Sequence, residues 1–275
     1  MEITTNGISI NVISESDSIP KNKTPILFLH GFTGSALDWK FIFSSLNPTC
    51  FPIAIDLPGH GETKLPNTLE HYSTEGYVNV VQAVIEYFEI TKLVIVGYSM
   101  GGRTALSFAV ENPNIVKALI LESSTAGIED EVERNLRIKT DSEIAKNILN
   151  NGIESFVQYW LGLPFFRSLK SLDELTYSKL IERKNNNAEQ GLANSLFGFS
   201  TGKMPSLWSR LNSLKTPILL IAGSLDRKYL RINKKMKELL PSSELEIVED
   251  SGHNTHLKNK REFTILINKF LNNLE

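Results

Sequence analysis

The chain of 275 residues contains a single cysteine, Cys50, so it cannot form a disulfide within itself. It has no apolar run near the roughly 18 residues that a membrane-spanning helix needs. Its first residues carry neither the basic start nor the apolar core of a signal peptide. The formal net charge is only −2, which gives no indication of a polyanionic partner. We therefore expect a cytoplasmic protein that binds neither nucleic acid nor membrane.

Short apolar runs alternate with stretches of helical periodicity along much of the chain. This alternation is typical of a mostly parallel sheet covered by helices on both faces, the α/β class. An Asn6-Gly7 pair predicts a tight hairpin over residues 3–10. We expect buried strands at 25–29, 51–55, 93–96, 116–121, 217–222 and 245–248, and helices at 37–46, 74–88, 103–109 and 261–274.

Residues 127–213 contain no comparable strand and have a helical pattern. We expect them to form a helical cap inserted over the carboxyl ends of the strands, where open α/β sheets bind ligands. The core would then comprise residues 1–126 and 214–275. We expect most of the aromatic residues of this cap to pack it onto the core; they are Phe156, Trp160, Phe165, Phe166, Phe197 and Phe199.

The most informative stretch is Gly97-Tyr98-Ser99-Met100-Gly101, which joins the strand at 93–96 to the helix at 103–109. A G-x-S-x-G sequence between a strand and a helix is typical of a nucleophile elbow, which raises the serine hydroxyl above the sheet. The flanking glycines leave room where strand and helix nearly touch. Ser99 is therefore the candidate catalytic residue.

A serine hydroxyl needs a histidine to accept its proton and a carboxylate to orient that histidine. With this elbow the three follow in the order Ser, acid, His. His253 lies between the last strand and the closing helix, and Asp226 follows the strand at 217–222. We therefore predict a triad of Ser99, Asp226 and His253, with Asp250 as the rival acid, too close in sequence to His253 to be its usual partner.

An oxyanion hole requires two backbone N–H groups directed at the developing negative charge. The residue after the nucleophile supplies one of them, and the loop after an earlier strand supplies the other. These positions are Met100 and, in the turn His30-Gly31-Phe32-Thr33-Gly34, Phe32. The glycines of that turn also have a purely structural explanation, since they let the loop reverse.

These residues resemble the α/β-hydrolase superfamily along nearly the whole chain. The segment Asp56-Leu57-Pro58-Gly59-His60-Gly61 also matches a turn common in that superfamily. The resemblance implies an α/β-hydrolase fold with an inserted cap. It does not by itself define the reaction, because the fold serves esterases, carbon–carbon hydrolases, lyases and non-catalytic receptors.

Further motifs resemble the 2-succinyl-6-hydroxy-2,4-cyclohexadiene-1-carboxylate (SHCHC) synthases of menaquinone biosynthesis. That family has G-Y-S-x-G-G-R at the elbow, E-S-S after the next strand and R-x-x-x-D in a cap helix. It also has W-x-x-x-P-x-F, R-x-x-N, G-x-x-D and G-H-N-x-H in the order found here. One departure is Thr125-Ala126-Gly127, where the family often has Pro-Gly after E-S-S. The resemblance covers roughly residues 25–275.

The resemblance implies roles for five further residues. Arg103, Arg137 and Arg183 match substrate-binding arginines, and Tyr98 and Trp160 match residues of the binding cavity. A planar guanidinium suits a substrate with several carboxylates. For Arg137 an alternative stays open, because a cap helix shifted by one turn would place Arg134 there instead.

The implied activity is that of a lyase that eliminates pyruvate from 2-succinyl-5-enolpyruvyl-6-hydroxy-3-cyclohexene-1-carboxylate to give SHCHC. Ser99 would act as a general base, without metal or organic cofactor, on a small polycarboxylate. Two alternatives remain: a hydrolase of ester or carbon–carbon bonds, and a receptor without activity. A neutral ester gives no reason for three arginines. The sequence makes no prediction of an oligomeric state.

Overall fold

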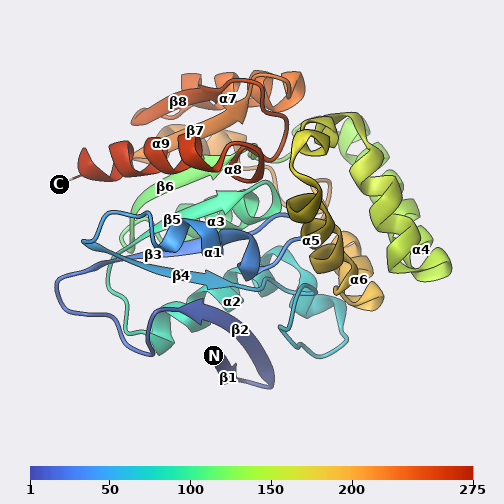
Figure 1. Ribbon diagram of the computed structural model, residues 1–275, viewed down its shortest axis with the longest axis horizontal. Coiled ribbons are helices and arrows are strands. Elements are labelled where there is room, and N and C mark those ends of the chain that lie inside the picture. Colours follow the sequence, from blue (N-terminus) through green and yellow to red (C-terminus); the bar gives the residue numbers. More distant parts are fainter. Residues whose placement is uncertain (275) are drawn as a thin grey trace.

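The computed structural model describes residues 1–274, in which one eight-stranded sheet forms the centre of the molecule (Figure 1). The strand order is β1-β2-β4-β3-β5-β6-β7-β8. The pairs β1–β2 and β2–β4 are antiparallel, and all the other neighbours are parallel. The strands are β1 Glu2–Thr5, β2 Ile8–Ser14, β3 Thr24–Leu29, β4 Cys50–Ile55, β5 Leu93–Tyr98, β6 Val116–Glu122, β7 Ile218–Gly223 and β8 Ser243–Val248.

Helices cover both faces of this sheet and bury a separate apolar layer on each. On one face lie α2 (Thr74–Tyr87), α3 (Met100–Glu111) and α7 (Arg227–Leu239). On the other lie the short helices η1 (Ala36–Trp39) and α1 (Lys40–Phe43), with α9 (Lys260–Asn272). The central strands β4, β5 and β7 are buried along their whole length, as parallel strands covered on both sides must be. The predicted mostly parallel sheet is thus confirmed.

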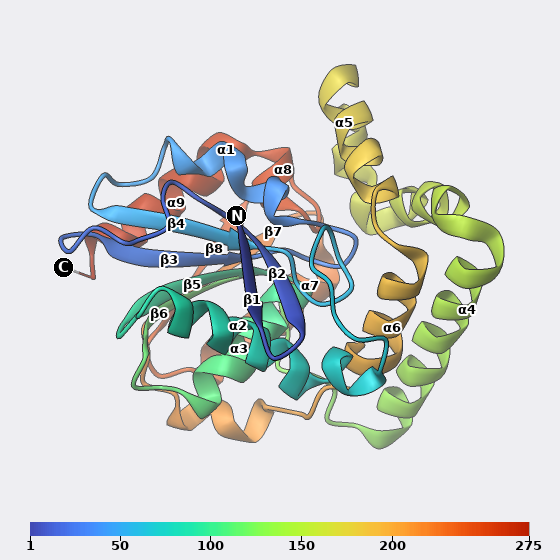
Figure 2. The same cartoon turned by 90° about the horizontal axis from the view of Figure 1, so that it is seen from below.

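The long connection between β6 and β7 is helical and lies beside the carboxyl ends of the parallel strands (Figures 1 and 2). It contains α4 (Glu131–Gly162), η3 (Pro164–Ser171), α5 (Glu174–Asn185), α6 (Glu189–Phe199) and η4 (Trp208–Ser213). The long helix α4 is interrupted at Gly152, whose φ of 80° is not helical. The apolar residues of α4 pack with those of η3, α5 and α6 in a third cluster, in addition to the two layers on the sheet.

The end of this connection returns to the core. Met204, Leu207, Trp208 and Leu211 are buried in the apolar layer that α2 and α3 share with the sheet. The domain boundaries at residues 126 and 214 therefore stay a prediction.

One local expectation was wrong in its extent, one helix was not predicted, and one expectation was confirmed. The predicted helix at 37–46 is shorter, with η1 and α1 spanning 36–43. The strongly charged α7 was not predicted, because few of its residues are buried and its apolar stripe is narrow. The N-terminal hairpin is confirmed, with positive φ at both Asn6 and Gly7, as a type I′ turn requires.

The remaining elements are the short helices η2 (Leu69–Tyr72) and α8 (Thr255–Lys258). Helix α8 begins two residues after His253, so the loop between β8 and α8 positions that histidine.

Candidate active site

Ser99 occupies the sharp turn between β5 and α3. Its backbone has φ 50° and ψ −102°, a conformation that costs energy in a residue with a Cβ. A Cβ on Gly97 would meet the backbone of Gly101, and one on Gly101 would meet the backbone of Leu29. The glycines of the motif are therefore required by the close approach of strand and helix.

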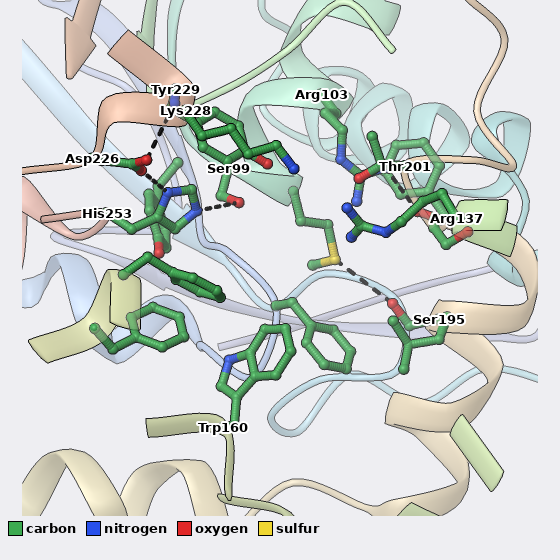
Figure 3. Close-up of a pocket in the computed structure, with 18 residues that line it drawn as sticks. Ser99, Arg103, Arg137, Trp160, Ser195, Thr201, Asp226, Lys228, Tyr229 and His253 are labelled. Atoms are coloured by element: carbon green, nitrogen blue, oxygen red, sulfur yellow. Dashed lines mark hydrogen bonds and ion pairs between the residues drawn. The ribbon is translucent and has the colours of Figure 1, made fainter. Parts of the chain in front are cut away.

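The three residues predicted as a triad lie in one chain of hydrogen bonds (Figure 3). Nε2 of His253 lies 3.0 Å from Oγ of Ser99, and Nδ1 lies 2.6 Å from Oδ2 of Asp226. Oδ1 of Asp226 accepts a hydrogen bond from the backbone N–H of Tyr229, and the N–H of His253 donates to the carbonyl of Phe165. This arrangement lets His253 accept the serine proton while the carboxylate fixes its tautomer.

The two residues predicted to form the oxyanion hole line the same cavity. Met100 is the first residue of α3, where a backbone N–H has no acceptor within the helix. Phe32 follows β3, and its ring packs edge-on against Trp160 of the cap. Their role as oxyanion donors stays a prediction.

Above Ser99 the cavity has a basic wall and an aromatic wall. The basic wall comes from α3, α4 and the first turn of α7, and Figure 3 shows its side chains directed toward the space beside Ser99. The aromatic wall includes Trp160, Phe165, Phe166 and Phe199. We expected most of the six aromatic residues of the cap only to pack it onto the core. That expectation is corrected, because these four of the six line the cavity.

Arg103 is buried, with only 7% of its surface exposed. Within residues 1–274 its guanidinium makes one hydrogen bond, from Nη1 to the carbonyl oxygen of Phe199 at 2.8 Å. Its Cζ also lies 4.5 Å from the centre of the Phe199 ring. Burial lowers the pKa of Arg103 to about 10, so the side chain is charged at neutral pH. Most of its donors are thus left for a ligand.

The structure places Arg137, and not Arg134, in the cavity wall. Arg137 Nε donates to Oδ2 of the buried Asp141 at 2.6 Å, one helical turn further along α4. Burial alone would lower the pKa of Arg137, but the charge of Asp141 and the hydrogen bond to it outweigh burial and raise that pKa. The R-x-x-x-D motif of the cap helix is therefore an ion pair that holds this arginine at the cavity.

Arg183 does not reach the cavity that contains Ser99. Its Nε lies 3.2 Å from Oδ1 of Asp38, which follows β3 in η1. It lines a separate small cavity between α5 and the start of α9, with Lys179 and Lys260. Of the three arginines predicted to bind the substrate, two therefore line the cavity that contains Ser99.

Lys228 is a basic residue of the cavity that the sequence reasoning missed. It lies in the first turn of α7, two residues after Asp226, and remains partly open to solvent. Burial, followed by the nearby charge of Arg137, lowers the pKa of its amine. The next residue, Tyr229, packs with its ring centre 4.5 Å from that of His253. The sequence feature that could have identified Lys228 and Tyr229 is their position, two and three residues after the predicted acid Asp226.

Tyr98 and Trp160 both line the cavity, as predicted. The ring of Tyr98 lies between His253 and His256, at centroid distances of 5.3 and 4.8 Å. Burial, and then the charge of Glu122, raise the pKa of Tyr98 well above its usual value, which keeps the phenol protonated. Within residues 1–274 the buried Nε1 of Trp160 and Oγ of Ser200 have no hydrogen-bond partner.

A second pair of acid and histidine lies behind the triad. Glu122, at the end of β6, is fully buried, and its Oε2 lies 2.6 Å from Nδ1 of His256. Its Oε1 accepts hydrogen bonds from the backbone and hydroxyl of Thr255, and its carbonyl accepts the N–H of Ser99. Glu122 therefore ties the elbow to the loop that carries His253.

No helix in residues 1–274 combines the length and the hydropathy that crossing a bilayer requires. The same residues contain no group of three or more His, Cys, Asp or Glu side chains placed to hold a metal ion.

Comparison with known proteins gives consistent matches over almost the entire chain. Residues 24–260 match the family model described as alpha/beta hydrolase fold. A Bacillus subtilis (strain 168) protein, named as a candidate SHCHC synthase, is 40% identical over 259 residues, 94% of each chain. The SHCHC synthase of Serratia proteamaculans (strain 568) is 29% identical over 90% of this chain and 93% of its own.

A solved structure agrees with the two sequence relatives. MenH from S. aureus superposes with a TM-score of 0.89 at 30% identity, covering 98% of this chain and 99% of that one. The likeness therefore extends over both the core and the cap.

Proposed function

The chain belongs to the α/β-hydrolase family, and within it we propose that the protein is an SHCHC synthase. It would eliminate pyruvate from 2-succinyl-5-enolpyruvyl-6-hydroxy-3-cyclohexene-1-carboxylate. One observation carries the proposal beyond the similarity to named synthases: a complete Ser-His-Asp chain opens into a cavity with three basic side chains.

The charge of the cavity suits the charge of this substrate. The substrate carries three carboxylates, one each on the ring, the succinyl group and the enolpyruvyl group. Arg103, Arg137 and Lys228 supply three positive charges, and the buried site strengthens their attraction for anions.

The triad would act here as a base. His253 accepts the Ser99 proton, so that the serine oxygen removes a proton from the ring carbon that bears the succinyl group. The electron pair moves onto the succinyl carbonyl oxygen, where the N–H groups of Phe32 and Met100 would stabilise the negative charge. As the carbonyl re-forms, the ring double bond shifts and the C–O bond to the enolpyruvyl group breaks. The departing pyruvate enolate takes up a proton, and the charges balance without metal or redox cofactor.

The same triad also fits nucleophilic hydrolysis, the alternative reaction class. A hydrolase of a neutral ester, however, would bury Arg103 without a ligand charge to offset the cost. That cost favours the lyase. We also infer that the enzyme works in the cytoplasm, because a substrate with three carboxylates does not cross a bilayer unaided.

The proposal is tested by measuring pyruvate release from the enolpyruvyl substrate, with a simple aryl ester assayed in parallel. We expect pyruvate to be released with a kcat/KM far above that for the ester, and the Ser99→Ala variant to release it on the order of 10³-fold more slowly. Faster hydrolysis of the ester would assign the chain to the hydrolases. Binding of the substrate with turnover of neither compound would indicate a receptor.

A further inference from the structure

Lys184 is a buried cation that the mechanism above does not use. It lies near the carboxyl end of α5 and is only 4% exposed. Burial lowers the pKa of its amine, and the charge of Asp38 counteracts this in part. Within residues 1–274 the amine makes no ion pair, since Asp38 pairs with Arg183 instead. An incompletely paired buried charge is costly, and such groups concentrate at functional sites.

Within residues 1–274 this amine has one hydrogen-bond partner, and that partner shows which loop the charge of Lys184 lies beside. Nζ of Lys184 donates to Oγ1 of Thr33 at 2.9 Å, and Thr33 directly follows Phe32, the predicted oxyanion donor. Thr33 is buried and has a φ of 66°, a left-handed conformation that a β-branched residue rarely adopts. Asn187 Nδ2 also donates to the Thr33 carbonyl, at 3.1 Å. Two residues of the cap thus bind the loop at this point.

We propose that Lys184 is a positioning residue, which fixes the oxyanion loop and places a positive charge behind it. This inference rests on the proposed function, because the charge that it stabilises is the one on the succinyl carbonyl oxygen. The end of α5 lies beside the loop after β3, so the cap contributes directly to holding the oxyanion loop in place (Figure 1). The carboxyl end of a helix also favours a cation.

Two variants separate the charge of Lys184 from its hydrogen bond. Lys184→Met removes both, whereas Lys184→Gln keeps a donor for Thr33 and removes only the charge. Lys179→Met is the matched control, because Lys179 is an exposed lysine of the same helix. A unit charge about 10 Å from a developing charge, at an effective dielectric constant of about 20, changes a rate by roughly tenfold.

We expect both Lys184 variants to lower kcat for pyruvate release by roughly tenfold, with KM within about twofold of the wild-type value. They should also bind an alkylboronic acid more weakly, since its anionic adduct with Ser99 places an oxygen at the oxyanion site. The control should match the wild type. If Lys184→Met does not fold, Lys184→Gln carries the same test.

Three outcomes would overturn the inference. They are an unchanged kcat in a folded Lys184 variant, wild-type activity of Lys184→Gln alone, and a KM increase as large as the kcat loss. The second outcome would mean that Lys184 acts only through its hydrogen bond to Thr33. The third would indicate that the cap is displaced. Failure of the proposed function is distinct, because the wild type would then release no pyruvate; ester hydrolysis, which forms an oxyanion at the same site, would serve to compare the variants.

Discussion

Replacement of Arg103 by methionine should change the affinity for the substrate and the stability of the fold in different ways. The variant keeps an apolar stem of similar length and removes a guanidinium that is 7% exposed. In the free protein that guanidinium makes one hydrogen bond, to the Phe199 carbonyl, and lies over the Phe199 ring. We expect the variant to lose affinity for the substrate without losing stability.

The pKa of Arg103 gives the expected change in stability. Burial is the main reason that this pKa is lowered, by roughly two to three units from the ordinary value of arginine, to about 10. At about 1.4 kcal/mol per pKa unit, the fold disfavours this charge by about 3 kcal/mol. Because the folded pKa is depressed, the cost is present throughout the range below about pH 10 and is relieved only above it. Methionine removes the cost, so we expect Tm to stay unchanged or rise.

The expected change in activity has the opposite sign. Loss of one partner of a desolvated charge pair costs roughly 2–5 kcal/mol, which is about 30-fold to several thousand-fold in kcat/KM. The assay is pyruvate release over a range of substrate concentrations, with thermal unfolding of the same preparations. Arg103→Lys should recover only part of the loss, because an ammonium group cannot bind a carboxylate with two parallel hydrogen bonds. A loss below about 0.5 kcal/mol would refute the reasoning and make Arg103 a structural residue.

The other predictions concern separate parts of the site. Ser99→Ala should lower kcat by on the order of 10³-fold in the pyruvate assay, and near-normal turnover would exclude Ser99 from the chemistry. Arg137→Met should raise KM, whereas its matched control Arg134→Met, outside the cavity, should not. Because the pKa of Lys228 is lowered and its protonated form binds anions, kcat/KM should decline at a lower pH in the wild type than in Lys228→Arg. Glu122→Ala leaves buried donors unpaired and should cost roughly 3–5 kcal/mol in urea unfolding, a loss that an unchanged midpoint would contradict.

The sequence was most informative where one local pattern determines a structure. Short apolar runs predicted the central strands, because strands covered on both faces must be apolar throughout. Ser99, Asp226 and His253 were found because each lies in the loop or turn after a strand, and the carboxyl ends of parallel strands meet at one edge of the sheet. The triad is thus a consequence of topology and could be predicted without side-chain coordinates.

Residues of the cap were harder to place, because their position depends on how helices pack and not on strand order. Periodicity shows that α4 is a helix, but it does not show which face meets the cavity. The choice between Arg134 and Arg137 needed the ion pair with Asp141, which fixes the orientation of one side chain. Phe199 looks in sequence like an ordinary core aromatic, and only the packed structure shows that it lines the cavity.

Arg183 and Lys228 show how the charge of a site can be retained while the residue that supplies it differs from the expected one. The motif predicts that Arg183 binds substrate, but its guanidinium pairs with Asp38 and lines a different cavity from the one that contains Ser99. Lys228 is brought to the cavity by α7, whose start is fixed by Asp226 as its N-terminal cap. The third cation therefore depends on the same carboxylate that orients His253. A change that displaces Asp226 should impair substrate binding as well as proton transfer, so that KM and kcat worsen together.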